Sequence, residues 1–354
     1  MSSTALTQRP RLGASPQKLL LPALVVMLVA AVALSLGAGA VSISAEDLWA
    51  IVTGRAPLNP SAAPVVWAIR LPRAVLGALA GAGLAAAGAM LQALFRNPLA
   101  DPGLIGVSSG AALSAAAVLV LGEHLVAAMP AAFGVLALPL AAFAGSVTTV
   151  LIVLRLAGPH ARISTASLLL AGIAVNALAG AATGLLIFVA SDAQLRAVTF
   201  WNLGSLGGAT WTTLAGAVPL LLVALLAAPR FASRLNLLLL GEAEAAHLGV
   251  DVEQLKRRVI TVSALGVGAG VALTGVIGFV GLVVPHLVRL LGGADHRLVI
   301  PGSCLLGAAL LLVADVIART VAAPSEVPIG IITALLGAPF LLGLLQRNAS
   351  LGDA

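Results

Sequence analysis

Ionisable side chains are scarce in this 354-residue chain, so those that stand beside or within apolar sequence are the first candidates for chemistry. Asp315 precedes Arg319 by four residues, a spacing that places both side chains on one face of a helix and allows an ion pair. Arg70 and Arg73 stand at the start of another apolar run. Such groups can pair with each other or bind acidic groups of another molecule, but they make no catalytic set.

Motifs for nucleotide or covalent chemistry are missing from the sequence. The only lysines are Lys18 and Lys256, and neither follows glycine or precedes serine or threonine, so there is no phosphate-binding P-loop. The patterns H-E-x-x-H and G-x-S-x-G do not occur either. The single Cys304 excludes an intramolecular disulfide and a cysteine metal cluster. We therefore predict no catalytic residue, no metal site and no ATP hydrolysis by this chain.

The composition indicates what kind of element must position the charged groups. Hydrophobic residues make up 60% of the chain and charged residues only 9%, whereas a soluble domain has about 25% charged residues. Apolar helices of about 20 residues are the expected unit for crossing a bilayer. Aromatic residues are only 3% and tyrosine is absent, which disfavours a membrane barrel with aromatic girdles. The net charge of +6 comes from scattered residues, so we expect no nucleic-acid partner.

Ten spanning segments predict an all-α, polytopic membrane protein with a lipid bilayer around it. The first apolar run follows Arg9, Arg11 and Lys18 and resembles a signal peptide. It exceeds the usual apolar core of about 7–15 residues, so we expect a retained helix. Gly77 and Gly81 lie one turn apart and should allow close helix packing. The segments lie near residues 19–41, 71–94, 102–121, 130–154, 165–190, 211–229, 258–274, 276–291, 298–320 and 327–346.

Charge distribution predicts the orientation and the domain boundaries. Of the 19 Lys and Arg residues, fourteen fall on the side of the two chain ends and five on the other side. Because basic residues favour the cytoplasm, both ends should be cytoplasmic in a multi-pass protein of the bacterial inner membrane. We predict a cytoplasmic tail over residues 1–18, one transmembrane domain over 19–346 and a cytoplasmic tail over 347–354. The five basic residues outside are Arg55, Arg70, Arg73, Arg196 and Arg319.

Several stretches of the chain occur together, in this order, in one protein family. They are residues 70–73 (RLPR), 96–103 (RNPLADPG), 164–172 (STASLLLAG), 241–249 (GEAEAAHLG), and 278–286 (GFVGLVVPH) with 328–330 and 337–339. Together they resemble the FecCD-type permeases of ABC importers for ferric siderophores, haem and cobalamin, and the resemblance covers nearly everything beyond residue 60. It implies a type II ABC importer permease architecture. It also implies two permease subunits, which we expect to be a homodimer, two cytoplasmic ATPases that bind ATP and Mg, and a periplasmic binding protein.

The resemblance assigns docking to three arginines. Arg70, Arg73 and Arg319 match arginines that meet glutamates on the two lobes of the binding protein in the family, where opposite charges speed docking. An arginine at a helix end can instead snorkel to the membrane interface. For Arg319, an ion pair with Asp315 is a further alternative.

The resemblance also implies a coupling loop over residues 236–250. Asn236 could cap one short helix, and Gly241 could separate it from a second helix that carries Glu242 and Glu244. Such a hairpin would fit a groove on the ATPase, whereas the plain alternative is a solvated loop. The family's coupling loop is matched at Gly241, Glu242, Ala245 and Gly249.

Two gates follow from the same resemblance. Small residues at the start of the fifth span could form a cytoplasmic gate, although Ser or Thr at a helix start is also the usual N-cap. Residues 200–208 could form a short outer helix near a periplasmic gate, and an interfacial tryptophan anchor is the alternative. The gate residues are Ser164, Thr165 and Ala166 on one side and Trp201, Asn202 and Gly204 on the other.

The cargo is the least determined prediction. Residues 97–110, 199–211 and 235–244 look most like haem permeases, so we expect haem as cargo moved by alternating access, with ferric siderophore or cobalamin as alternatives. Haem iron needs an axial His, Cys, Met or Tyr, but the five histidines fall in loops or near helix ends, so we expect no cofactor bound by this chain. An ion-coupled secondary transporter remains a more remote alternative, with Asp315 as its ionisable group. A structural membrane scaffold would not need the coupling loop.

Overall fold

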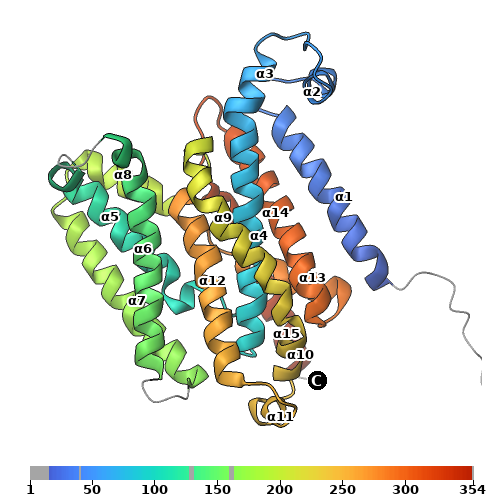
Figure 1. Cartoon of the computed structure of the whole chain (residues 1–354), viewed down its shortest axis with the longest axis vertical. Coiled ribbons are helices and arrows are strands. Elements are labelled where there is room, and N and C mark those ends of the chain that lie inside the picture. The colour runs from blue at the N-terminus through green and yellow to red at the C-terminus, as the bar shows by residue number, and fades with distance from the viewer. Residues whose placement is uncertain (1–15, 40, 127–130, 159–162, 353–354) are drawn as a thin grey trace, which may run out of the picture.

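A computed structural model describes residues 16–39, 41–126, 131–158 and 163–352, and every regular element within them is a helix (Figure 1). The prediction of an all-α polytopic membrane protein is confirmed. The α-helices are α1 (Pro16–Gly37), α2 (Ala45–Val52), α3 (Ala62–Val65), α4 (Leu71–Leu94), α5 (Val107–Val126), α6 (Ala131–Ala157), α7 (Thr165–Phe188), α8 (Asp192–Leu203), α9 (Trp211–Ala227), α10 (Ala232–Leu238), α11 (Glu242–His247), α12 (Val252–Thr274), α13 (Val280–Gly292), α14 (His296–Thr320) and α15 (Ile329–Gly352). Short 3₁₀ turns are η2 (Pro102–Ile105) and η3 (Ala228–Phe231), and η1 (Val66–Arg70) is π-helical.

The ten predicted spans correspond in order to ten apolar helices. Within the described residues, seven helices are long and apolar enough to cross a membrane. Three shorter apolar helices complete the set, at Val107–Gly122, Val280–Gly292 and Ile329–Gly343. The predicted boundary at residue 347 is not a helix end, because α15 continues to Gly352. Arg9 and Arg11 of the predicted tail lie outside the described residues.

The two ends of the bundle differ in what they carry. In Figure 1 the start of α1 and the C-terminal end lie at the end that carries α11, whereas α2 and α3 lie at the opposite end. We call these the α11 end and the α2 end. This arrangement agrees with an even number of spans, which leaves both chain ends on one side.

Helix α4 lies at the centre of the bundle, between α12 and α14 (Figure 1). Its glycines allow this position, because a Cβ added at Gly81 would overlap the carbonyl of Gly307 on α14. A Cβ at Gly88 would likewise overlap the backbone of Gly281 on α13. The predicted close approach at Gly81 is thus present, and it brings the first residues of α4 against the last turns of α14.

Helix α7 has a broad surface that contacts no other described part of the chain. Large apolar side chains along it are exposed, including Leu178 at 71% and Phe188 at 86%. On the same helix, Gly180 and Gly184 have open space where a Cβ would lie. An apolar surface of this kind must face lipid or another membrane-embedded chain.

Candidate functional site

An ion cluster at the α2 end joins Arg73, Asp315, Arg319 and Glu326. Asp315 is only 1% exposed, and Arg73 donates to its carboxylate from Nη2 at 2.8 Å and from Nε at 3.0 Å. Arg319 Nε approaches the other oxygen at 3.5 Å, which confirms the ion pair predicted from the four-residue spacing. Arg73 also donates from Nη1 to Glu326 at 2.7 Å. The ion cluster therefore holds two buried arginines with one buried carboxylate, Asp315, and one partly exposed carboxylate, Glu326.

Glu326 is the accessible member of the ion cluster. Its side chain is 43% exposed, and it lies in the connection between α14 and α15. The hydrogen bond from Arg73 holds the pKa of this carboxyl below its usual value. A depressed pKa means that the pair contributes stability above the ordinary glutamate pKa and loses it as the pH falls through the lowered value.

Arg70 and Arg319 bind the end of α1. Arg70 donates from Nη1 to the carbonyl of Leu36 at 2.6 Å and to that of Gly37 at 2.7 Å, and from Nη2 to Val41. Arg319 donates from Nη2 to the carbonyl of Ser35 at 2.5 Å. The last carbonyls of a helix lack partners within it and carry partial negative charge, so two guanidinium groups stabilise this helix end.

The three arginines predicted to dock a binding protein are thus buried in this structure. Each is bonded within the chain, and none extends to the surface as a snorkelling side chain would. Sequence analysis missed Arg73 as a partner of Asp315 and missed Glu326 altogether. The signal available was the rule that a buried carboxylate needs a partner, but the rule does not say which arginine provides it.

The short helix near the predicted periplasmic gate is displaced from its expected position. Helix α8 covers Asp192–Leu203, not residues 200–208. It begins with a capping box between Ser191 and Gln194, and it ends because Gly204 adopts φ +74°, which glycine tolerates best. The predicted helix over 200–208 is therefore wrong in its second half, where the chain turns.

The residues predicted for this gate lie where three connections meet. Gly204 accepts a hydrogen bond from Ile329 at the start of α15, at 3.1 Å. Ser205 donates to the carbonyl of Thr274 at the end of α12, at 2.7 Å. Trp201 is half-buried in a pocket of about 430 Å³ between α5, α6, α8, α9 and α12. The side chain of Asn202 forms no hydrogen bond with any residue that the structure describes. Movement of α15 would therefore displace Gly204, and movement of the turn after α12 would displace the neighbouring Ser205.

At the α11 end, the coupling loop forms two short helices, as predicted. Gly241, with φ +130°, separates α10 from α11, and Ala245 is buried against the bundle. Gly249 ends the second helix with φ +86°. The expected capping role of Asn236 is wrong, because this residue lies inside α10, which already begins at Ala232.

Asn236 instead ties the coupling loop to the start of α14. Its amide donates to Asp295 at 2.6 Å, and its carbonyl oxygen accepts from the backbone of His296 at 2.9 Å. The backbone of Arg297 and this amide together lower the pKa of Asp295. The first end of the coupling loop is thereby fixed to a membrane-spanning helix.

Glu242 ties the other half of the coupling loop to the predicted cytoplasmic gate. One carboxylate oxygen binds the ammonium group of Lys256 at 2.8 Å, and the other accepts from the Thr165 hydroxyl at 3.4 Å. Lys256 also donates to the carbonyl of Ile163 at 2.6 Å, and the Ile163 N–H donates to Glu253 at 2.6 Å. Sequence analysis missed Lys256 and Glu253, because the charged run EQLKRR at residues 253–258 reads as a solvated helix start and does not show that Lys256 is buried.

The gate residues begin α7, and Ser164 also acts as its N-cap. The Ser164 hydroxyl accepts from the Ser167 N–H at 3.2 Å, so the capping alternative is present. Thr165 is half-buried towards Glu242, whereas Ala166 is exposed. The structure therefore places the predicted gate within hydrogen-bond distance of the predicted coupling loop.

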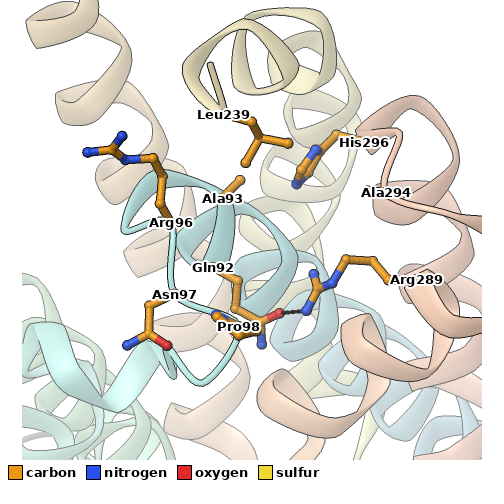
Figure 2. A pocket seen from close by; sticks show the side chains of 9 residues that line it. All are labelled: Gln92, Ala93, Arg96, Asn97, Pro98, Leu239, Arg289, Ala294 and His296. Carbon is orange, nitrogen blue, oxygen red and sulfur yellow. Dashed lines mark hydrogen bonds between the residues drawn. The ribbon is translucent and has the colours of Figure 1, made fainter. Parts of the chain in front are cut away.

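A basic pocket of about 210 Å³ opens beside the coupling loop (Figure 2). Arg96 and Asn97 lie across it from Arg289 and His296, and Leu239 of the coupling loop covers one side. Arg289 donates to Gln92, and no acidic residue lines the pocket. Nε2 of His296 is buried without a hydrogen-bond partner among the described residues. The coupling loop and the pocket therefore form one continuous surface, and the arginines of the pocket suit an acidic group.

The fold defines an all-helical, polytopic membrane protein with a polar cluster at each end. Residues 27–347 match the FecCD transport family. The chain therefore belongs to the FecCD transport family, whose members are permeases of ABC importers, and the fold predicted from the resemblance is confirmed.

Characterised relatives cover almost the whole chain. The hemin transport system permease protein HmuU of Yersinia pestis is 45% identical over 339 residues, which are 95% of this chain and 98% of HmuU. The cobalamin import system permease protein BtuC of Halobacterium salinarum is 45% identical over 282 residues, 80% of this chain and 73% of that protein. A solved metal-chelate-type ABC transporter in an inward-facing conformation superposes with a TM-score of 0.82 at 33% identity, covering 92% of this chain and 98% of that one.

Proposed function

We propose that this chain is the membrane permease of an ATP-driven importer that moves haem into the cytoplasm by alternating access. The observation that supports haem most directly is the 45% identity with a hemin permease along nearly the full length of both proteins. Cobalamin is the second candidate cargo, because a cobalamin permease is equally identical over a shorter span. Ferric siderophore is the third.

Haem uptake is the first prediction to test. We expect proteoliposomes that contain the permease and its ATPase to take up haem when the binding protein and ATP are present on their respective sides. Uptake should stop when either the binding protein or ATP is omitted. Cobalamin and ferric-siderophore uptake, measured in parallel, provide the control for cargo. Uptake of only one of those two would replace the cargo, and ATP-independent uptake driven by an ion gradient would contradict the ABC mechanism.

We propose that the α11 end is cytoplasmic and binds a separate ATPase subunit. The basic residues at that end, where α1 starts, support this orientation. The coupling loop and the adjoining basic pocket provide the docking surface, with the pocket accepting an acidic side chain of the ATPase. Because Asn236 is bonded to the start of α14 and Glu242 to α12, a displacement of this loop would be transmitted to these two helices.

We propose that the α2 end receives the periplasmic binding protein through the ion cluster. Arg73 is already bonded to Glu326, whose exposed carboxylate is the one a partner's carboxylate could replace. Such an exchange would satisfy Arg73 without leaving a buried charge unpaired. Since Glu326 lies three residues before Ile329, which bonds Gly204, docking would act next to the proposed periplasmic gate. Arg70 and Arg319 support this site by holding the end of α1.

We propose that the permease is a homodimer that uses α7. The exposed positions of Gly180 and Gly184, one turn apart, would allow the backbone of a second copy to approach closely. A central pathway would then run between the two copies, with Ser164, Thr165 and Ala166 at its cytoplasmic end and Trp201, Asn202 and Gly204 near its periplasmic end.

A leucine in place of Gly184 on α7 should weaken the dimer. We expect Gly184→Leu to reduce dimerisation about tenfold, equivalent to about 1.4 kcal/mol, because the side chain would separate the two backbones. Fluorescence energy transfer between labelled copies in liposomes measures the association. Gly216→Leu on α9 is the matched control, since that glycine is equally open within the chain. Unchanged dimerisation of the Gly184 variant would assign this face of α7 to lipid.

A further inference from the structure

Lys256 is the most deeply buried charged group at the α11 end. Only 2% of its surface is exposed, although it lies in the second turn of α12. We propose that Lys256 is a positioning residue that transmits movement of the coupling loop to the cytoplasmic gate at the start of α7. This inference rests on the proposed function, in which the coupling loop and the gate have those roles.

The first link joins the coupling loop to α12 and α7 at once. Glu242 is the first residue of α11, and its two carboxylate oxygens have different partners. Oε2 lies 2.8 Å from Nζ of Lys256, and Oε1 lies 3.4 Å from Oγ1 of Thr165. Because the ion pair is the shorter and charged contact, displacement of α11 acts first on Lys256 and less on Thr165.

The second link holds the backbone immediately before α7. The carbonyl of Ile163 accepts from Nζ of Lys256 at 2.6 Å, and the N–H of Ile163 donates to Glu253 at 2.6 Å. Glu253 and Lys256 lie on adjacent turns of α12, 3.8 Å apart at their charged atoms. Both backbone groups of Ile163 are therefore held by one face of α12, and the side chain of Ile163 is itself buried. A shift of this face must carry residues 163–165 with it.

The partners of Lys256 come from three separate segments, which is what a transmitting residue requires. They lie on α11, on α12 itself and at Ile163, the residue before Ser164, which caps α7. Burying an ammonium group costs free energy unless each of its N–H donors has a partner. The loss of one contact of Lys256 would therefore favour movement of its other partners towards the ammonium group. The three segments are thus expected to move together rather than independently.

The experiment reads the gate without using any cargo. Ala166→Cys, in a Cys304→Ser background, provides the only thiol, at an exposed position of the gate. The assembled permease–ATPase complex is labelled with a membrane-impermeant maleimide with and without a non-hydrolysable ATP analogue. With Lys256 present, we expect the labelling rate to change about fivefold or more on nucleotide binding. Lys256→Met should leave the rate insensitive to nucleotide, while nucleotide binding by the complex persists.

The controls separate transmission from a general loss of stability. Arg257→Met removes the same charge from the next residue, which is exposed and belongs to neither link, and should keep the full response. Lys256→Arg should retain part of the nucleotide response, because a guanidinium group can reach Glu242 and the carbonyl of Ile163. If Lys256→Met does not assemble, the test uses Glu253→Ala, which removes the acceptor of the Ile163 N–H and the ion pair with Lys256.

Two results would overturn the inference. A normal nucleotide response in an assembled Lys256→Met complex, or in Glu253→Ala, would mean that these contacts only stabilise the fold. A parent protein whose gate does not respond to nucleotide would remove the proposed roles of gate and coupling loop, and the role of Lys256 with them. Neither result depends on whether haem is the cargo, so failure of the cargo assignment is recognised separately.

Discussion

Asp315→Asn is expected to destabilise the protein by about 3–5 kcal/mol, because it would leave two buried arginines with too few carboxylates. Arg73 bonds Asp315 through two nitrogens, and Arg319 approaches the other oxygen. An amide in place of the carboxylate retains the shape but loses the charge, and its NH₂ group would face a guanidinium group. Thermal unfolding in detergent, followed by the accessibility of Cys304, measures the loss.

Glu326→Gln is the matched control for Asp315→Asn. It also removes one carboxylate that is bonded to Arg73, but this side chain is 43% exposed. Water can replace the lost contact, so the expected loss is at most about 1 kcal/mol. Equal losses in the two variants would show that burial does not govern the strength of the ion cluster.

The contacts of Asp315 also weaken the alternative of an ion-coupled transporter. A proton or sodium carrier needs a carboxylate that is free to bind and release its ion. Asp315 is held by Arg73 and Arg319 and is almost inaccessible. The group that this alternative depends on is therefore already neutralised within the chain.

Glu242→Lys is expected to abolish ATP-driven uptake. The new ammonium group would stand beside that of Lys256, where the native carboxylate lies 2.8 Å away, and the contact with Thr165 would be lost. Repulsion between two cations in a partly buried site should displace α11 and detach the ATPase from the gate. Uptake into proteoliposomes measures the loss of transport, and ATP hydrolysis by the complex shows whether the ATPase is still active.

Glu244→Lys is the control for Glu242→Lys. It makes the same charge change on the same helix, at an exposed residue that forms no ion pair among the described residues. We expect it to retain most of the uptake. If both variants lose uptake equally, the net charge of α11 towards the ATPase matters more than the contact with Lys256.

Much of the architecture could be predicted from the sequence. The preference of an apolar segment for the bilayer is a sum over neighbouring residues, so it can be evaluated along the chain without knowing the fold. The spans and the break at Gly241 are both local properties of this kind. The four-residue spacing of Asp315 and Arg319 is also local, and the pair is present.

Errors arose where two local signals competed or where a cap was assigned from one residue type. Trp201 and its neighbours are compatible with a helix, but the capping box at Ser191 starts α8 earlier and Gly204 ends it. Asn236 is a common N-cap residue, yet the helix continues through it because the preceding turn is already helical. Its side chain is then free to bind α14 instead.

The meeting of distant charged groups is what only the tertiary structure decided. Arg73 and Asp315 are 242 residues apart, and they meet because Gly81 and Gly307 let α4 and α14 pack backbone against backbone. Lys256 contacts Glu242 and Ile163 only because α11 and the start of α7 pack beside α12 in the folded bundle. By itself, the sequence determined that these are membrane helices and their order along the chain, although not the residue at which each begins. It could not determine the ion pairs, because the choice of partner depends on which helix faces come into contact, and that is a property of the packed bundle rather than of any one segment.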